Sequence, residues 1–404
     1  MTLFTVNIRR NDRARKILLV IGILLIAANL RAPFTSLAPL LNLIRESFSL
    51  SAAAAGMLTT LPLLVFAATS PFVPMAGRRY GLERALIAGV AVLGAGIIVR
   101  SFGGVWGLYL GTALVGGGIA VGNVLLPSLL KRDFPNKIAA LTGAYSLSMG
   151  IAAALASTVM IPLSTASGMG WRFALFASII LPVIALAVWL PLRTAPPIRT
   201  GKRMPAVHTD RVWHSPLAWQ VTLFLGMNSF IYYVVAGWLP AILAEAGYSA
   251  ARAGTLHGLM QFATAIPGLV AGLVIARTRD QRGLAAGVSM LSAVSLFGLA
   301  WFPQWALAWT AMFGAGVGAT FILGLTFVSM RSGSVAQAAA LSGMAQSLGY
   351  LLAAIGPPSI GAMYDAYASW TGPLLVCALL ALAMAGVGTM AGRAIQIAPR
   401  KPVC

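Results

Sequence analysis

A single charged residue, Arg31, stands inside the first long apolar stretch of the chain, which runs from about residue 17 to residue 43. At about 1.5 Å of rise per residue, Arg31 lies roughly 20 Å along a helix that starts near Lys16. That depth is well inside a hydrocarbon layer of about 30 Å. A charge there costs on the order of 3 kcal/mol, so such residues usually face a bundle interior, a cavity or a partner. The fold must therefore shelter a cation within the membrane.

Two prolines follow Arg31 and weaken the same helix. Pro33 has no N–H to donate to the carbonyl of Asn29, and Pro39 has none for the carbonyl of Thr35. At membrane depth, carbonyls released in this way need protein groups or a wet cavity as partners. We therefore expect the first helix to be weakened beside the buried cation.

The composition places the whole chain in the membrane. Of its 404 residues, 59% are hydrophobic and only 9% are charged, whereas a soluble domain is about 25% charged. Long apolar windows predict an all-α polytopic membrane protein with twelve transmembrane helices. The predicted spans are approximately residues 17–43, 52–75, 82–101, 105–130, 138–163, 172–192, 216–243, 252–276, 284–302, 306–329, 338–362 and 372–391.

One connection is longer than the others and divides the spans six plus six. It contains Pro196-Pro197 and several charged residues. We expect an N-terminal six-helix bundle over residues 1–195, a cytoplasmic linker over residues 196–215 and a C-terminal six-helix bundle over residues 216–404. Short matches between the halves, such as Ser51–Leu58 with Ser249–Leu256, predict that the two bundles are pseudo-symmetric repeats.

The basic residues predict the orientation. With the N-terminus inside, 23 of the 28 Lys and Arg residues fall on the inner side. By the positive-inside rule, both termini and the linker are cytoplasmic. This bias also accounts for most of the net charge of +20, so we expect the lipid bilayer and a small-molecule substrate as partners, and no nucleic acid.

The sequence contains no constellation typical of a membrane-embedded enzyme. All eight acidic residues fall at span ends or in loops, and the two cysteines are Cys377 and the terminal Cys404. We therefore expect no metal, no cofactor and no catalytic residues. The carboxylate proton relay common in coupled transporters is also missing at depth, so no acid lies at the level of Arg31.

Candidate binding residues centre on Arg31. A buried cation needs an anion, several hydrogen-bond acceptors or water, and a small anionic substrate would supply the first. The alternative is that Arg31 snorkels or clamps the released carbonyls. His257 and Gln261 share a helix face in the eighth span, because they are one turn apart. His257 can donate to an anion or titrate near neutral pH; the alternative is a histidine packed between helices.

Further uncharged polar side chains lie at span depth. Asn228 and Tyr232 share a face in the seventh span, Tyr145 lies in the fifth, and Asn29 precedes Arg31 by two residues. Such groups are as compatible with hydrogen bonding between helices as with ligand binding. We predict that they complete a polar pocket around Arg31 with His257 and Gln261.

Several segments resemble the cyanate permease / 2-nitroimidazole transporter (CynX/NimT) family of the major facilitator superfamily. They are Asn29-Leu-Arg-Ala-Pro-Phe-Thr-Ser36, Gly56-Met-Leu-Thr-Thr-Leu-Pro62, Gly116-Gly-Gly-Ile-Ala-Val-Gly-Asn-Val-Leu-Leu-Pro127, Lys131-Arg-Asp-Phe-Pro135 and Leu141-Thr-Gly-Ala-Tyr-Ser146. The resemblance covers most of the N-terminal half and is looser in the C-terminal half. It implies the major facilitator fold, a bacterial inner-membrane location and transport of cyanate or a small nitrogenous heterocycle.

The loop between the second and third spans departs from the superfamily pattern, which usually reads G-x-x-x-D-R-x-G-R-R. Arg78 stands where that pattern has Asp, and Glu83 stands where it has a basic residue. A gating ion pair of the usual polarity is therefore in question, although Arg78 or Arg79 remains able to pair with Glu83.

We expect a secondary transporter that moves a small anionic or nitrogenous solute by alternating access and functions as a monomer. The alternatives are an efflux transporter for drugs or toxic compounds with the same fold, or a membrane sensor or channel that does not carry a solute actively.

Overall fold

A computed structural model describes residues 12–70, 72–134, 137–192, 210–268, 278, 280–333 and 335–397. In this part of the chain, every regular element is a helix. Ten of these helical segments are long and apolar enough to cross a membrane. The all-α membrane architecture is therefore confirmed. Of the other two predicted spans, the eighth continues into residues 269–276, outside the described residues, and the eleventh corresponds to the 33-residue helix α17 (Val335–Tyr367).

The spans expose apolar side chains where lipid would meet them. Ile98, Leu155 and Val183, each within a candidate span, are between 46% and 60% exposed. Apolar surface of this kind is costly in water but suits the hydrocarbon layer. The chain is a multi-pass membrane protein.

The described helices group into two compact units. The first consists of Met1–Leu50, Leu61–Gly201 and Ala250–Gly258, and the second of Ser51–Thr60, Lys202–Ser249 and Leu259–Cys404. Two helices contribute to both: α4 (Ala52–Thr69) begins in the second unit, and α13 (Ala250–Ala263) begins in the first. The predicted linker, residues 196–215, lies mostly outside the described residues, and the bundle boundaries stay a prediction.

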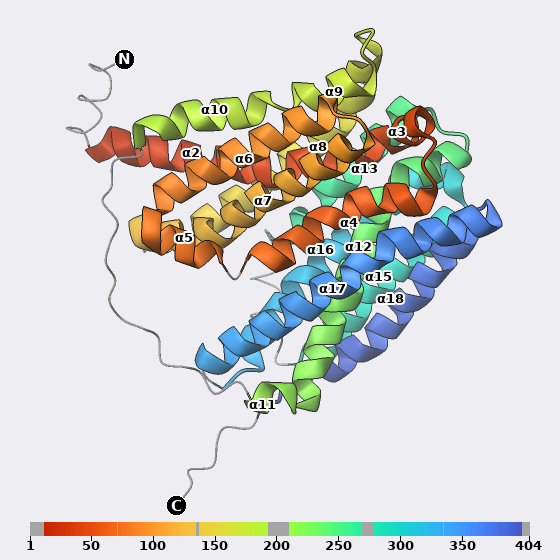
Figure 1. Cartoon of the computed structure of the whole chain (residues 1–404). Coiled ribbons are helices and arrows are strands. Elements are labelled where there is room, and N and C mark those ends of the chain that lie inside the picture. The colour runs from red at the N-terminus through yellow and green to blue at the C-terminus, as the bar shows by residue number, and fades with distance from the viewer. Residues whose placement is uncertain are drawn as a thin grey trace, which may run out of the picture. The chain divides into compact units, whose positions relative to one another are not determined.

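The first unit is built on a layer of long helices that run side by side (Figure 1). Its elements are α2 (Asp12–Thr35), η1 (Ala38–Leu40), α3 (Leu41–Phe48), α5 (Val73–Tyr80), α6 (Leu82–Phe102), α7 (Val105–Asp133), α8 (Ile138–Thr165), α9 (Trp171–Ala177), α10 (Ile180–Trp189) and η3 (Leu190–Leu192). Close helix packing here uses glycine: a Cβ at Gly118 of α7 would stand 2.6 Å from the carbonyl oxygen of Gly89 in α6. Leu93, Leu129 and Trp189 fill the core.

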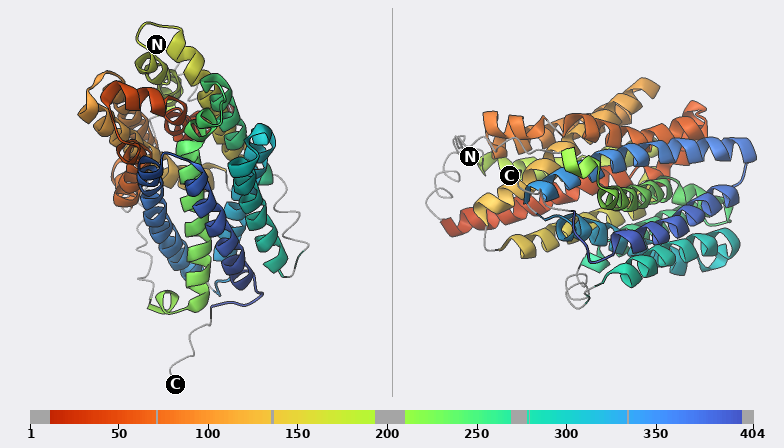
Figure 2. Two further views of the ribbon diagram at one scale, coloured as in Figure 1. Left: turned by 90° about the vertical axis from the view of Figure 1, so that its right-hand side faces the viewer. Right: turned by 90° about the horizontal axis from the view of Figure 1, so that it is seen from below.

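The second unit contains α11 (Asp210–Trp213), α12 (Pro216–Glu245), α15 (Arg282–Trp301), η4 (Pro303–Trp305), α16 (Ala306–Met330), α17 and α18 (Thr371–Ala391). Helices α15 and α18 lie side by side, and α12 packs along α17 (Figure 2). Helix α12 is buried along most of its length, including Trp238, whose Nε1 donates to the carbonyl of Pro357 at 2.9 Å.

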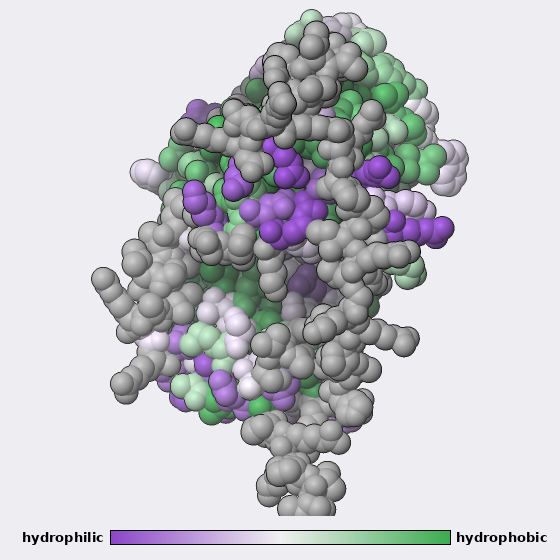
Figure 3. Space-filling view, turned by 90° about the vertical axis from the view of Figure 1, so that its left-hand side faces the viewer, coloured by the Kyte–Doolittle hydropathy of each residue, from purple (hydrophilic) through white to green (hydrophobic). Residues whose placement is uncertain are grey.

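Hydrophilic side chains gather at the end of the first unit that carries α5 (Figure 3). The exposed charged residues described there include Arg79, Arg84 and Lys137. All three are basic, which is typical of a cytoplasmic surface.

Helix α2 breaks within the stretch that the two prolines weaken. The helix ends at Thr35, and a short 3-10 turn follows before α3 begins. The N–H of Leu37 bonds to Phe34 at 3.3 Å, so the carbonyl of Pro33 loses its usual helical donor. The carbonyl of Thr35 loses its donor to Pro39. The break therefore exposes two acceptors inside the protein.

A second arginine, Arg100, satisfies the first of these acceptors. Its Nη1 donates to the Pro33 carbonyl at 2.7 Å, and its Nη2 lies 3.3 Å from the hydroxyl of Ser36 and 3.4 Å from that of Ser178. The side chain is 1% exposed. Arg100 lies in the last turn of α6, near the end of a span. The structure buries it, because the break in α2 offers a cation a cluster of oxygen acceptors.

We expect Arg100→Ala to destabilise the protein, because the change leaves the Pro33 carbonyl without its charged donor and opens a void. A lost hydrogen bond of this kind costs about 1 to 3 kcal/mol. Thermal unfolding of the purified protein in detergent measures the effect. Arg84→Ala, on the exposed face of the same helix α6, is the matched control and should change the melting temperature little. Equal melting temperatures for the two variants would contradict the assigned role.

Candidate functional site

Arg31 occupies the last full turn of α2 before the break. Its side chain is partly buried, and it lies within electrostatic range of Tyr145 on α8. The hydroxyl of Thr35, one turn later, donates toward the carbonyl of Arg31 at 3.1 Å. The structure thus brings together two of the predicted residues, Arg31 and Tyr145, at the weakened end of α2.

Asn29 is fully buried two residues before Arg31. Its Nδ2 donates to the carbonyl of Leu25 at 2.8 Å, one turn earlier on the same helix. Within the described residues its Oδ1 has no hydrogen-bond partner. A buried amide oxygen without a donor is unfavourable, so Asn29 offers an acceptor near Arg31.

His257 belongs to a hydrogen-bonded chain that ends at the break. Its Nδ1 lies 2.7 Å from the hydroxyl of Ser157 on α8, and that hydroxyl lies 3.3 Å from the carbonyl of Thr35. The Thr35 carbonyl is the one that Pro39 deprives of its helical donor. His257 and Ser157 are both 0% exposed. The sequence predicted that the released carbonyl needs a partner, and the structure identifies it as Ser157.

Two glycines bring the His257 helix close enough for this contact. A Cβ at Gly258 would stand 2.6 Å from the carbonyl oxygen of Ala154, and one at Gly254 would stand 3.0 Å from that of Ser157. Only glycine allows α13 to approach the α8 backbone so closely. The spacing of four residues puts both glycines on the face that carries the Ser157 contact.

The remaining predicted residues belong to the second unit. The hydroxyl of Tyr232 on α12 donates to Oε1 of Gln261 on α13 at 2.8 Å, and both side chains are buried. Asn228, one turn before Tyr232, is 3% exposed, and its Oδ1 has no hydrogen-bond partner among the described residues. Asn228 and Tyr232 lie one turn apart on α12, and Tyr232 connects α12 to Gln261 on α13. The prediction that all seven residues line one pocket stays a prediction.

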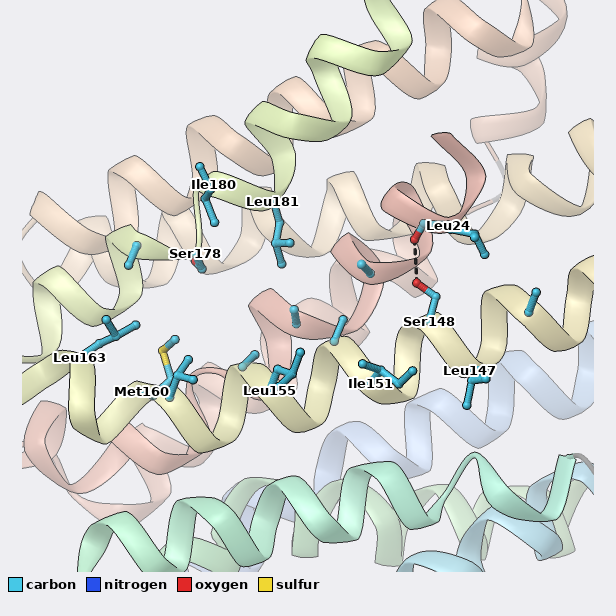
Figure 4. Close-up of a pocket in the computed structure, with 17 residues that line it drawn as sticks. Leu24, Leu147, Ser148, Ile151, Leu155, Met160, Leu163, Ser178, Ile180 and Leu181 are labelled. Carbon is cyan, nitrogen blue, oxygen red and sulfur yellow. Dashed lines mark hydrogen bonds between the residues drawn. The ribbon is translucent and has the colours of Figure 1, made fainter. Parts of the chain in front are cut away.

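An apolar groove is a separate feature of the first unit (Figure 4). It encloses about 610 Å³ between α2, α8 and the segment around α9 and α10. Its few polar groups include Ser148, which donates to the carbonyl of Leu24 at 2.9 Å. None of the predicted binding residues lines it. An apolar groove of this kind cannot compensate an anion.

Arg132, which was not among the predicted gating residues, pairs with the acidic residue of the predicted gating segment. Glu83 is 2% exposed and pairs with Arg132 at 2.5 Å, and Arg132 also contacts Asp133 at 2.8 Å. Its hydrogen bond to Asp133, together with Glu83, holds the pKa of the Arg132 guanidinium above its ordinary value. Arg79 is exposed over the ring of Tyr80, and the side chain of Arg78 lies outside the described residues.

The second unit repeats this arrangement with a neutral partner. Gln281 lies 198 residues after Glu83, and Arg331 lies 199 residues after Arg132. Nη2 of Arg331 donates to Oε1 of Gln281 at 2.5 Å and to the carbonyl of Gly392 at 3.0 Å. Burial lowers the pKa of Arg331, with Asp280 acting in the opposite direction. The same contact is thus ionic in one unit and amide-based in the other.

Sequence reasoning missed Ser157, Arg100 and Arg132 as partners. Of these three residues, only Arg132 had a signal in the sequence, because the offset between the two repeats aligns it with Arg331. In the part of the chain that the structure describes, no group of three or more His, Cys, Asp or Glu residues is placed to hold a metal ion.

Comparisons with known proteins agree with this architecture. Residues 19–354 match the family model of the Major Facilitator Superfamily. The chain is 53% identical over 382 residues to the 2-nitroimidazole transporter of Escherichia coli (strain K12), covering 95% of this chain and 97% of that protein. It is 27% identical over 345 residues to the cyanate transport protein CynX of the same organism, covering 84% of this chain and 88% of the relative.

A solved structure shares the fold. The crystal structure of a D-xylose-proton symporter superposes with a TM-score of 0.73 at 14% identity, covering 92% of this chain and 96% of that chain. The expected resemblance to the cyanate and 2-nitroimidazole transporters is confirmed, and the chain belongs to the Major Facilitator Superfamily of secondary transporters.

Proposed function

We propose that this protein is a secondary transporter that carries 2-nitroimidazole, or a small nitrogenous solute like it, by alternating access. The observation that carries this proposal is the 53% identity to a 2-nitroimidazole transporter over nearly the full length of both chains. Cyanate is the second candidate, supported by the more distant likeness to a cyanate transport protein.

Arg31 is the proposed anchor for the solute. A guanidinium presents planar donors in a fixed fork, which suits a nitro group or a small anion. The Pro33 and Thr35 carbonyls at the break take donors from Arg100 and Ser157, so Arg31 is not required as the donor to these two. Asn29 and Tyr145 complete the proposed contacts in the first unit, and Asn228, Tyr232, His257 and Gln261 supply further polar groups.

The proposed orientation follows from the distribution of basic residues, and the proposed bundles follow from the repeat between the two halves of the sequence. The protein sits in the bacterial inner membrane with both termini cytoplasmic, as the positive-inside bias favours. It works as a monomer of two six-helix bundles, residues 1–195 and 216–404, with no nucleic-acid partner, no cofactor and no catalytic role. Efflux of a toxic heterocycle and import of a nutrient use the same site in opposite directions.

We expect Arg31→Gln to lower transport about tenfold to a hundredfold, because a hydrogen bond to a charged group contributes about 1.5 to 3 kcal/mol. Arg31→Lys should retain an intermediate rate, since it keeps the charge but loses the fork. Counterflow of labelled 2-nitroimidazole in proteoliposomes, repeated with labelled cyanate, measures both variants and identifies the better solute.

The control for Arg31 is Arg84→Gln, which changes an exposed residue outside the proposed site. It should transport at the wild-type rate. Normal transport by a folded Arg31→Gln would show that Arg31 is structural. A wild-type protein that exchanges neither solute would refute the proposed function, and saturation of exchange would exclude a channel.

We expect Tyr232→Phe to raise the KM for counterflow about fivefold, because Gln261 loses a buried hydrogen bond worth roughly 1 kcal/mol. Tyr233→Phe, the adjacent residue on α12, is the matched control and should leave KM unchanged. If both variants behaved as wild type, the Tyr232–Gln261 pair would have no part in solute binding.

A further inference from the structure

His257 is the residue at membrane depth that is best suited to exchange a proton near neutral pH. The chain has three histidines, and the other two, His208 and His214, precede the seventh span. All eight acidic residues fall at span ends or in loops, so a carboxylate relay is missing at depth. Imidazole ordinarily titrates near pH 6.5, within the physiological range.

The hydroxyl of Ser157 links the His257 ring to the break in α2, and it has only one proton to donate. In one arrangement, His257 Nδ1–H donates to Ser157, and Ser157 donates to the carbonyl of Thr35. In the other, Ser157 donates to a bare Nδ1, and the Thr35 carbonyl loses that donor. The distances of 2.7 and 3.3 Å permit either arrangement. A protonated ring allows only the first, because both of its nitrogens are donors.

The protonation state of His257 is therefore connected to the turn that carries Arg31. Loss of the Ser157 donor would leave the Thr35 carbonyl, already without its helical partner, poorly satisfied inside the protein. The hydroxyl of Thr35 bonds back to the carbonyl of Arg31 at 3.1 Å. A proton on His257 thus stabilises the broken end of α2 in its described form.

The charged and titratable groups on the elements that meet at His257 favour coupling to an anion. Arg31 lies one turn before Thr35 on α2, Tyr145 lies twelve residues before Ser157 on α8, and Arg252 is exposed five residues before His257 on α13. Tyr232 meets the next turn of α13 through Gln261. A second positive charge near Arg31 is unfavourable unless an anion binds between or beside them.

We propose that His257 is the proton-carrying site of this transporter, and that one proton crosses the membrane with each anionic solute molecule. The proposal rests on the proposed transport function. The proton adds to a bare ring nitrogen on one side of the membrane and leaves to water on the other, with no other bond made or broken. By linkage, solute at Arg31 and a proton at His257 each strengthen the binding of the other.

The experiment measures protons moved per solute molecule in proteoliposomes that contain the full-length protein. Labelled 2-nitroimidazole or cyanate reports solute uptake, and a trapped pH indicator reports protons. Protein-free liposomes correct for permeation. We expect a ratio of about one for wild type and near zero for His257→Gln, which keeps a hydrogen-bonding side chain but cannot ionise. The ratio does not depend on rate, so a merely slower variant leaves it unchanged.

His214→Gln, an exposed histidine outside the spans, is the matched control and should keep the wild-type ratio. A His257→Gln ratio equal to that of wild type would overturn the proposal. Wild-type exchange without proton movement would also overturn it but would leave the proposed transport function intact. Loss of wild-type exchange would refute both.

If transport by the His257→Gln variant is too slow to measure, the Ser157→Ala variant tests the proton-carrying role of His257. Removing the hydroxyl takes away the acceptor of a protonated ring, so the pH of half-maximal exchange should move to lower pH by roughly half a unit or more. An unchanged pH profile in this variant would contradict the proposed chain from His257 through Ser157 to Thr35.

Discussion

The break in α2 is the constraint on which the functional part of the structure depends. Helical donors are lost at this point within the membrane, and the carbonyls left without them must be satisfied by protein groups. Arg100 on α6 reaches the carbonyl of Pro33, whose usual donor Leu37 bonds to Phe34 instead, and Ser157 on α8 reaches the carbonyl of Thr35. The break therefore ties three helices of the first unit together, one turn after Arg31.

The need to satisfy the Thr35 carbonyl also explains why two glycines of α13 lie against α8. Ser157 can serve both Thr35 and His257 only because α13 approaches α8 closely at Gly254 and Gly258. A polar chain buried in this way is stabilising when every member has a partner and costly when one is missing. Asn29 and Asn228, with buried amide oxygens that lack a described donor, are two of the described residues where that requirement is not met.

The internal repeat conserves geometry more than charge. Arg132 meets Glu83 in the first unit, and Arg331 meets Gln281 in the second, each at 2.5 Å. In the first unit two carboxylates compensate the guanidinium. In the second, an amide oxygen and backbone carbonyls do so, and they also connect Arg331 to Gly392 near the end of the described chain. The ion pair of the first unit and the amide contact of the second therefore differ in their response to salt.

The sequence by itself determined the membrane class, most of the span boundaries, the weakening of the helix beside Arg31 and the need for a partner at the Thr35 carbonyl. These follow from hydropathy, helix length and proline chemistry, which act locally along the chain. Only the tertiary structure decided which side chains meet. It buried Arg100 in the last turn of α6, and it paired Glu83 with Arg132 and His257 with Ser157. Those contacts join residues 49 to 100 positions apart, and helix crossing, which no local pattern encodes, brings them together.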